Sequence, residues 1–573
     1  MFSYRDSALG ENAMTRILTG LFTTVLMAIG GTALAEGIAG TGSLGGAVSA
    51  DQPFVAAKVY AQHQSKPILF MVYTQNGEYW APNLMPGQYE ITVRKDGFAS
   101  EARYLTINAD ESKQANFSLR SARQGVTYTG SRTLETLHDE PLVVAAYDEI
   151  FPPGPGRDVL EEWCIVCHGV NFIPRQPTFR EGWEAHIDYM TASSAFGVEG
   201  AASMMPPEAL ADGKRELVLD YLAENFGEDK PPRAVMSPGE APLDEVALGK
   251  AMYVEYQFAN TEKRPGRWTQ EPHFDKDGRV WVTERGVPSG MTMLDPWTGE
   301  YVDYDNPKPK GSPHGVVVDS QGDVWWAGRD VHLARLTPAT GEVREYEINK
   351  NGMHGHTPVL DSKENVWFSM LQGNSIGKWD RATDTIQLWE SPIGRDRPYG
   401  ILMSPDDKVW YAKFHDCGVA MFDPETESFT QYKAQSEPCT VRRLGLDSKG
   451  IVWFGLFSRG ILACLDPGTG EVREIPIPTG ISEPYDVWPD PFDNVWISDG
   501  AQEGVLIKFD QGTEEFTFYP SPQRTDFPKV AITREGAVWY APRMVAMTKG
   551  GPAGLGVLYP DKDKMTTFGA FYE

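Results

Sequence analysis

Val366-Trp367-Phe368-Ser369 belongs to a pattern that recurs through the second half of the chain. A Val-Trp pair recurs at a regular spacing, with the tryptophans at positions 281, 325, 367, 410, 453, 496 and 539. The successive intervals are 44, 42, 43, 43, 43 and 43 residues. A nearly fixed period of this length is typical of a repeated supersecondary unit that buries its apolar face against the next copy.

Each repeat carries signals for four short strands. The order is an apolar strand, a tight turn such as Asp319-Ser320-Gln321-Gly322, the Val-Trp strand, a third strand, a Thr-Gly turn and a fourth strand such as 343–346. Four antiparallel strands make one propeller blade, and a closed ring of blades removes most exposed sheet edges. The sequence therefore predicts a mainly β protein with a seven-bladed β-propeller over residues 263–573.

The run from Val366-Trp367-Phe368-Ser369 to Asn374-Ser375-Ile376-Gly377-Lys378-Trp379-Asp380 resembles the streptogramin (virginiamycin B) lyase family of propellers. Members of that family open a cyclic depsipeptide by elimination, with a histidine general base, a glutamate and a magnesium ion. The resemblance implies that His314 or His356 would be the base and Glu284 the carboxylate. It is specific for the fold and weak for the reaction, because propellers host many unrelated chemistries.

The mouth of the propeller channel is the natural place for a site. The residue eleven positions before each Val-Trp tryptophan marks the start of the first strand of a blade, and these residues are Gln270, His314, His356, Tyr399, Arg442, Tyr485 and Pro528. Two histidines, two tyrosines and an arginine at equivalent positions predict a functional site. The alternative is a structural channel whose polar groups bond one another and ordered water.

Two kinds of site are open at this mouth. His354 lies two residues before His356, and with His314 these imidazoles are candidates for a second metal site that holds copper, magnesium or calcium. Arg442 and the two tyrosines favour instead a pocket for an anionic or phenolic small molecule.

Cys164-Ile165-Val166-Cys167-His168 is the strongest chemical signal in the chain. In this spacing two thiols can add to the vinyl groups of haem while the adjacent histidine ligates the iron. The sequence therefore predicts one covalent c-type haem, attached by Cys164 and Cys167 and ligated by His168.

The residues around this motif resemble a class I cytochrome c domain over 146–230. Trp183, Ile187 and Met190 follow at helical spacing. In that family the sixth iron ligand is a methionine just before a proline, and Met205 precedes Pro206. Spacing alone leaves Met204 open as the ligand.

The first 35 residues predict a secretory signal peptide, because Arg16 precedes an apolar run over 17–29 and Ala33-Leu34-Ala35 offers a small-x-small cleavage site. We therefore expect a periplasmic protein. No later apolar stretch is long enough for a membrane-spanning helix.

Residues 36–122 predict a small β-sandwich. Short alternating strands are broken by turns at Asn76-Gly77 and Pro86-Gly87. The glycine and aromatic spacing resembles the carboxypeptidase regulatory-like domains, which are non-catalytic modules.

The other three cysteines lie in the propeller. Cys417 and Cys439 fall in loops expected on the same face, so a disulfide is predicted between them. Cys464 is expected to be a buried thiol.

The charge and the domain combination narrow the function. A net charge of −27 argues against nucleic acid and anionic membranes as partners. An elimination reaction moves no net electrons and has no use for a haem. We therefore expect an oxidoreductase that oxidises a small molecule at the channel mouth and passes electrons through the haem to a soluble acceptor. A lyase with an accessory haem and a non-enzymatic electron-transfer or binding protein are the alternatives.

Overall fold

The computed structural model describes residues 37–572, except 96, 122–142, 166–167, 192–204, 206, 236–241, 309–311, 329–332, 349–354, 372, 393–395, 415, 437–438, 480–481, 501–503, 524, 526 and 543–552. Within these described residues, every helix is too short or too polar to span a lipid bilayer. Residues 1–35, where the signal peptide is predicted, lie outside them.

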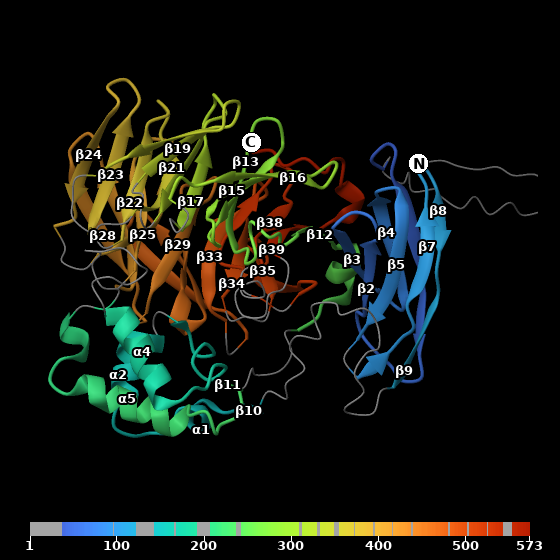
Figure 1. Ribbon diagram of the computed structural model, residues 1–573, viewed down its shortest axis with the longest axis horizontal. Coiled ribbons are helices and arrows are strands. Elements are labelled where there is room, and N and C mark those ends of the chain that lie inside the picture. Colours follow the sequence, from blue (N-terminus) through green and yellow to red (C-terminus); the bar gives the residue numbers. More distant parts are fainter. Residues whose placement is uncertain are drawn as a thin grey trace, which may run out of the picture. The chain divides into compact units, whose positions relative to one another are not determined.

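Six consecutive four-stranded antiparallel sheets form most of the C-terminal half of the protein (Figure 1). Their strands are β13 (Thr269–Phe274), β14 (Val280–Glu284), β15 (Gly290–Asp295) and β16 (Glu300–Asp305); β17 (Pro313–Val318), β18 (Val324–Gly328), β19 (Leu333–Thr337) and β20 (Glu342–Tyr346); β21 (Gly355–Leu360), β22 (Val366–Met370), β23 (Ser375–Asp380) and β24 (Thr385–Glu390); β25 (Pro398–Met403), β26 (Val409–Lys413), β27 (Gly418–Asp423) and β28 (Ser428–Lys433); β29 (Val441–Leu446), β30 (Val452–Leu456), β31 (Ile461–Asp466) and β32 (Glu471–Pro476); and β33 (Pro484–Pro489), β34 (Asn494–Asp499), β35 (Val505–Asp510) and β36 (Glu515–Pro520).

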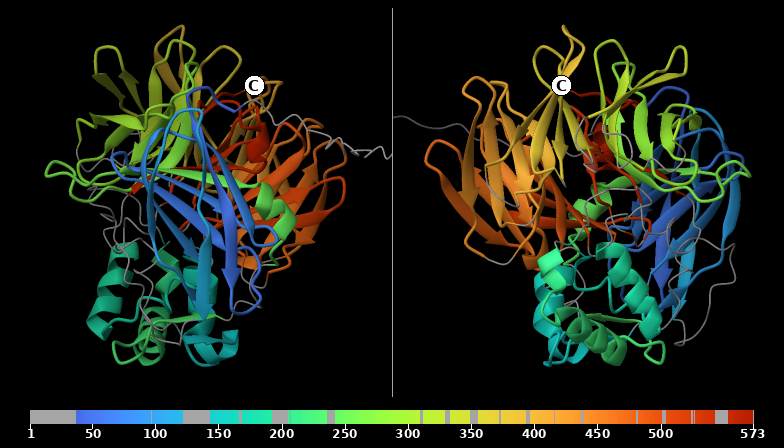
Figure 2. Two further views of the ribbon diagram at one scale, coloured as in Figure 1. Left: turned by 90° about the vertical axis from the view of Figure 1, so that its right-hand side faces the viewer. Right: turned by 60° about the vertical axis from the view of Figure 1, so that its left-hand side comes forward.

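The sheets form a closed ring, as the predicted propeller requires. The first strand of each sheet contacts the first strand of the next, and β37 (Val530–Ile532) contacts both β33 and β13. Second strands such as β22 are buried along their whole length, whereas fourth strands such as β24 are exposed at alternate residues. The first strands therefore lie innermost and the fourth strands outermost (Figures 1 and 2).

A side-chain hydrogen bond explains why the Val-Trp pair recurs. In five repeats the indole Nε1 donates to an aspartate six residues earlier, over 2.9–3.0 Å; the pairs are Trp281–Asp275, Trp325–Asp319, Trp367–Asp361, Trp453–Asp447 and Trp496–Asp490. The same carboxylate also accepts backbone N–H groups of the turn between the first two strands, as Asp319 does from Gln321 and Asp323. Each aspartate thus fixes the turn and satisfies a buried indole.

The seventh Val-Trp pair lies in a larger sheet that begins at β37. This sheet runs in the order β37, β38 (Val538–Tyr540), β39 (Ala553–Tyr559), β12 (Met252–Phe258), β3 (Ile68–Tyr73), β2 (Lys58–His63), β5 (Gly87–Arg94) and β7 (Arg103–Ile107). β12 pairs antiparallel with β39 on one side and with β3 on the other. A strand that precedes the first blade in sequence therefore joins the C-terminal strands to the N-terminal domain.

The N-terminal domain is built from two sheets, as predicted. The second sheet contains β4 (Glu78–Leu84), β1 (Gly42–Ala50), β9 (Phe117–Ser121), β6 (Phe98–Ala99) and β8 (Ser112–Gln114), with β8 paired to β1. Leu44 and Phe117 from this sheet share a buried core with Phe70 and Ile91 from the other.

The segment around the Cys-x-x-Cys-His motif is helical. It contains α1 (Tyr147–Ile150), α2 (Arg157–Leu160), a π-helical turn (Glu161–Ile165), α4 (Arg180–Thr191) and α5 (Lys214–Asn225), with a short parallel pair of β10 (Val143–Ala145) and β11 (Arg233–Val235); α6 (Glu245–Lys250) precedes β12. Trp183 and Ile187 pack with Leu219 and Leu222, and the Trp183 indole donates to the Phe226 carbonyl oxygen over 2.9 Å. This segment has its own small core.

Two of the predictions for propeller cysteines can be compared with the structure. Cys417 and Cys439 form the expected disulfide, with Cα atoms 5.1 Å apart. Cys464 on β31 is a thiol, but it is half-buried rather than fully buried.

Candidate functional site

The first strands of the sheets carry an irregularity at the positions where a site was predicted. In all six four-stranded sheets the pairing of first and second strands shifts register there, between residues 269 and 272, 313 and 315, 355 and 358, 398 and 401, 441 and 444, and 484 and 486. A regular strand sends neighbouring side chains to opposite faces, whereas a bulge can turn two neighbours to the same side. Two residues per blade can therefore meet at the centre of the ring.

The predicted histidines and tyrosines lie together in one buried cluster. The ring centroids of His314 and His356 are 3.8 Å apart, and those of His356 and Tyr399 are 3.7 Å apart. The hydroxyls of Tyr399 and Tyr485 are hydrogen-bonded over 2.6 Å. Gln270 joins the cluster through its amide Nε2, which lies 3.1 Å from His314 Nε2. These contacts join blades that are distant in sequence.

Arg442 completes this cluster through aromatic contacts. Its guanidinium carbon lies 3.9 Å from the Phe457 ring centroid, 4.5 Å from that of Tyr485 and 5.4 Å from that of Phe414. A guanidinium over aromatic faces is favourable because the ring quadrupole attracts the cation. We call Gln270, His314, His356, Tyr399, Arg442 and Tyr485 the aromatic layer. Pro528, the seventh residue at this repeat position, adds no polar group.

Glu284 has a different set of contacts. Its carboxylate accepts hydrogen bonds from the backbone N–H groups of Trp268 and Gly286 and lies 3.5 Å from Arg267. Burial raises the pKa of Glu284 above its ordinary value, and these donors and Arg267 oppose the shift. The recorded contacts of Glu284 fix the loop before β13 and give it no link to the histidines, so they do not support the catalytic role that the family resemblance implied.

The proposed second metal site is not supported by the described residues. They contain no group of three or more His, Cys, Asp or Glu side chains that could hold a metal ion, and His354, the third predicted ligand, lies outside them. Both ring nitrogens of His314 are engaged, Nε2 by Gln270 and Nδ1 by Lys529 at 3.3 Å. In this structure His314 thus belongs to a hydrogen-bond network with Gln270 and Lys529.

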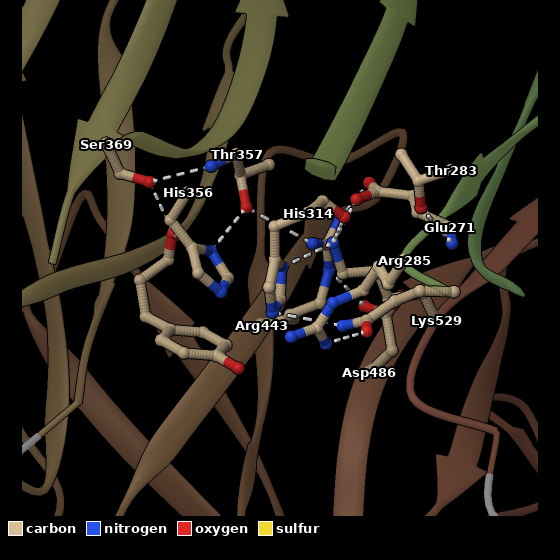
Figure 3. A network of polar contacts seen from close by, with 12 residues as sticks. Glu271, Thr283, Arg285, His314, His356, Thr357, Ser369, Arg443, Asp486 and Lys529 are labelled. Atoms are coloured by element: carbon tan, nitrogen blue, oxygen red, sulfur yellow. Dashed lines mark hydrogen bonds and ion pairs between the residues drawn. The ribbon is translucent and has the colours of Figure 1, made fainter. Parts of the chain in front are cut away.

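A second set of central residues escaped the sequence analysis. Ten positions before the Val-Trp tryptophans, one residue after the aromatic layer, the chain has Glu271, Gly315, Thr357, Gly400, Arg443, Asp486 and Lys529. Arg443 lies 2.8 Å from Glu271 and 3.4 Å from Asp486, and the Lys529 side-chain nitrogen contacts the Glu271 carboxylate (Figure 3). We call Glu271, Arg443, Asp486 and Lys529 the charged layer.

Small residues in the other blades make room for these long side chains. A Cβ atom on Gly400 would lie 2.6 Å from the Arg442 carbonyl oxygen and 2.9 Å from the Arg443 Cα. The sequence analysis missed the charged layer because neighbouring side chains of a regular strand point to opposite faces. The residue after an inward-facing one was therefore expected to face outward. The sequence does contain a pattern that could have revealed this layer. Four charged residues occupy the same repeat position in strands that are otherwise apolar.

The charged layer is buried. The pKa values of its side chains are set by this burial and by the opposite charges beside them. Burial lowers the pKa of Lys529 to about 7, although Glu271 raises it. Burial also raises the pKa of Asp486, which Arg443 opposes. For Arg443, burial disfavours the cation, but Glu271 and Asp486 outweigh it and raise the pKa above its ordinary value.

Three of the predicted haem-site residues lie within the described part of the helical segment. Cys164 is half-buried, and the His168 ring stacks on Phe172 with centroids 4.4 Å apart. Met205 is buried, and its backbone N–H donates to the Met190 carbonyl oxygen over 3.2 Å. A thiol, an imidazole and a thioether are three of the four groups that the predicted c-type haem would use. Cys167 and Met204 lie outside the described residues.

A hydrogen bond connects this segment with the strand entry beside the aromatic layer. The Val170 N–H, two residues after His168, donates to the Glu483 carboxylate over 2.7 Å. Glu483 is buried two residues before Tyr485, and burial together with Asp499 raises its pKa to about 8.

Comparisons with known proteins agree with the two β regions. Residues 250–503 match the Virginiamycin B lyase family, and residues 43–120 match the carboxypeptidase regulatory-like domain. A crystal structure of virginiamycin B lyase from Staphylococcus aureus is 17% identical; the match covers 54% of this chain and 99% of that one, with a TM-score of 0.48. A streptogramin B lyase structure is 18% identical over 54% of this chain and 97% of that one, also with a TM-score of 0.48. No curated protein matches the chain.

Proposed function

We propose that the protein is an exported haem-linked oxidoreductase. The aromatic layer would bind and oxidise a small anionic or phenolic molecule, and a c-type haem on Cys164, Cys167 and His168, with Met205 as sixth ligand, would pass the electrons to a soluble periplasmic acceptor. The observation that carries the proposal is the Val170–Glu483 hydrogen bond, which joins the haem-binding sequence to the strand that presents Tyr485. We also infer seven blades, the seventh made of β37, β38, β39 and β12.

The side chains suit this task. Arg442 offers a cation beside aromatic faces, which favours an anionic or aromatic substrate. His356 lies against Tyr399 and His314, where it can take a proton from a bound hydroxyl. Haem c, when bound, supplies a one-electron acceptor.

A lyase is the second candidate, favoured by the family match over 250–503. It needs a carboxylate that acts with the histidine base. Glu284 instead bonds Arg267 and the backbone of Trp268 and Gly286. These contacts do not favour Glu284 as the carboxylate of a lyase.

The test begins with the full chain exported in a host that matures c-type haem. A denaturing gel stained for haem should show covalent attachment, and small anionic and phenolic compounds are then screened for reduction of the haem absorbance. His356→Ala should slow reduction by the best compound about 10²–10⁴-fold, with an unchanged haem spectrum.

The matched control is His186→Ala, because His186 is exposed on α4 and should leave the rate unchanged. A His314→Ala/His356→Ala double variant that retains the full rate would exclude the aromatic layer as the site. A protein without covalent haem would exclude the oxidoreductase.

A further inference from the structure

A continuous chain of hydrogen bonds links the two central layers (Figure 3). It runs from Arg285 to Gln270, His314, Lys529 and Glu271, all of which are buried. Each member contributes a known number of donors and acceptors, so the positions of the protons along it can be worked out.

Arg285 fixes the orientation of Gln270. The Arg285 guanidinium donates to Gln270 Oε1. Arginine stays protonated in proteins and accepts no hydrogen bond, so Gln270 must turn its oxygen toward Arg285 and its NH₂ group toward His314. The Gln270 amide therefore donates to His314 Nε2 over 3.1 Å. A neutral His314 then carries its proton on Nδ1.

This tautomer decides the state of Lys529. The Lys529 amine donates to Glu271 and to the His314 carbonyl oxygen, the latter over 2.8 Å, and it lies 3.3 Å from His314 Nδ1. An ammonium group has three donors and no acceptor and would face the Nδ1–H as a second donor. A neutral amine has two hydrogens and one lone pair, which match the two acceptors and the one donor around it.

Burial and the surrounding charges act on Lys529 in opposite directions. Arg443 pairs with Glu271 at 2.8 Å and with Asp486 at 3.4 Å, so the two carboxylates already share one cation and Lys529 is not their sole partner. Burial lowers the pKa of Lys529 to about 7, against the opposing effects of Glu271 and Asp486. Near neutral pH the neutral and the protonated forms of Lys529 are therefore similar in free energy.

We propose that Lys529 is the proton acceptor behind His314 in substrate oxidation, a role that rests on the proposed function. When His314 takes a proton at Nε2 from the aromatic layer, its Nδ1–H bond breaks and that proton forms a new N–H bond on the Lys529 amine. Gln270 gives up its hydrogen bond to Nε2, and Lys529 becomes an ammonium ion paired with Glu271. One proton binds at His314 Nε2 and one leaves His314 Nδ1 for Lys529, and no electron passes along these hydrogen bonds.

The experiment is NMR of the full chain labelled with ¹⁵N-histidine, with the His314 signals assigned by their loss in His314→Gln. Above pH 8 the Nδ1 of His314 should be protonated and Nε2 unprotonated. Between about pH 8 and 6, as Lys529 gains its proton, the two nitrogens should exchange these signals. Lys529→Met should abolish the exchange near pH 7.

Lys413→Met is the matched control. Lys413 is equally buried and contacts Asp396 at 3.2 Å and Gln431 at 2.6 Å, on a strand other than those of the charged layer. It should leave the His314 exchange intact. An Nε2-protonated His314 above pH 8, or an exchange that persists in Lys529→Met or is lost in Lys413→Met, would overturn the proposal. The NMR measurement uses no substrate. Its result can therefore be interpreted even if the protein does not carry out the proposed oxidation.

Discussion

Arg442 and Arg443 are neighbours on β29 and equally buried, at 7% exposure each, yet they occupy different environments. Arg442 lies over the faces of Phe457 and Tyr485, at 3.9 and 4.5 Å. Arg443 is held by two carboxylates from other blades. Arg442 thus lies against aromatic rings, whereas Arg443 lies between opposite charges. The centre of the ring therefore contains two chemically distinct layers that are one residue apart in sequence.

The difference suggests a division of labour. The side chains of the charged layer contact one another across the ring, so they can hold the blades together. They also include a group that can take up a proton. The aromatic layer presents rings, hydroxyls and one cation, which are groups suited to a ligand.

The largest effect should come from removing the cation of the charged layer. Arg443→Met leaves Glu271 and Asp486 with less compensation in a buried place, which should lower the free energy of unfolding by about 3–5 kcal/mol. Arg442→Met removes mainly contacts with aromatic faces and should cost about 0.5–2 kcal/mol. Urea denaturation of both variants measures the difference. Equal losses would mean that the two layers are not energetically distinct.

A buried carboxyl outside both layers should make the stability of the protein depend on pH. Glu255 on β12 accepts hydrogen bonds from Gln523 at 2.6 Å and Tyr540 at 2.9 Å, and burial raises its pKa to about 7. The unfolded carboxyl titrates near 4.3, so between these values the folded state binds the extra proton and stability falls as pH rises.

Glu255→Gln should remove this fall, which amounts to about 3 kcal/mol between pH 4.5 and 8. Urea denaturation at several pH values checks it, and the slope that remains includes the contribution of Glu483, whose pKa is raised to about 8. An unchanged slope in the variant would show that Glu255 ionises normally in the folded protein.

The smallest effect should come from forcing two neighbouring first strands apart. Gly400→Ala places a Cβ atom 2.6 Å from the Arg442 carbonyl oxygen, so the first strands of two blades must separate, at about 1–3 kcal/mol. Gly266→Ala is the control, because a Cβ atom there meets nothing within 4 Å. Thermal unfolding of both variants tests it, and equal melting temperatures would show that the strands can adjust freely.

Much of the fold could be predicted because it repeats. The Val-Trp period predicted the four-stranded units, and the Asp–Trp hydrogen bond supplies its physical cause. The aromatic layer could be located by counting, since equivalent positions in a ring of blades face the same axis. Arg443 could not be found by alternation, because a register shift in β29 lets two neighbouring side chains turn inward.

Other features depend on contacts that no local pattern encodes. The contacts of Glu284 with Arg267 and with the backbone of Trp268 and Gly286 could not be foreseen from its place at the end of a strand. The hydrogen bond between His314 and Lys529 could not be foreseen either, because the two residues are more than two hundred positions apart in sequence. Burial and pairing are properties of the assembled ring, and a single sequence shows neither.

The position of β12 has a consequence for how the protein folds. Its partner β39 lies about 300 residues later in the chain, and Glu255 of β12 pairs with Gly556. Contacts of such long separation form slowly, because loop closure costs entropy before any contact repays it. The six regular sheets can form from local hairpins as they emerge, whereas the last sheet must wait for residues 553–559. The edge of β12 stays open until then, so this strand is where an incompletely folded chain would pair with another copy and aggregate.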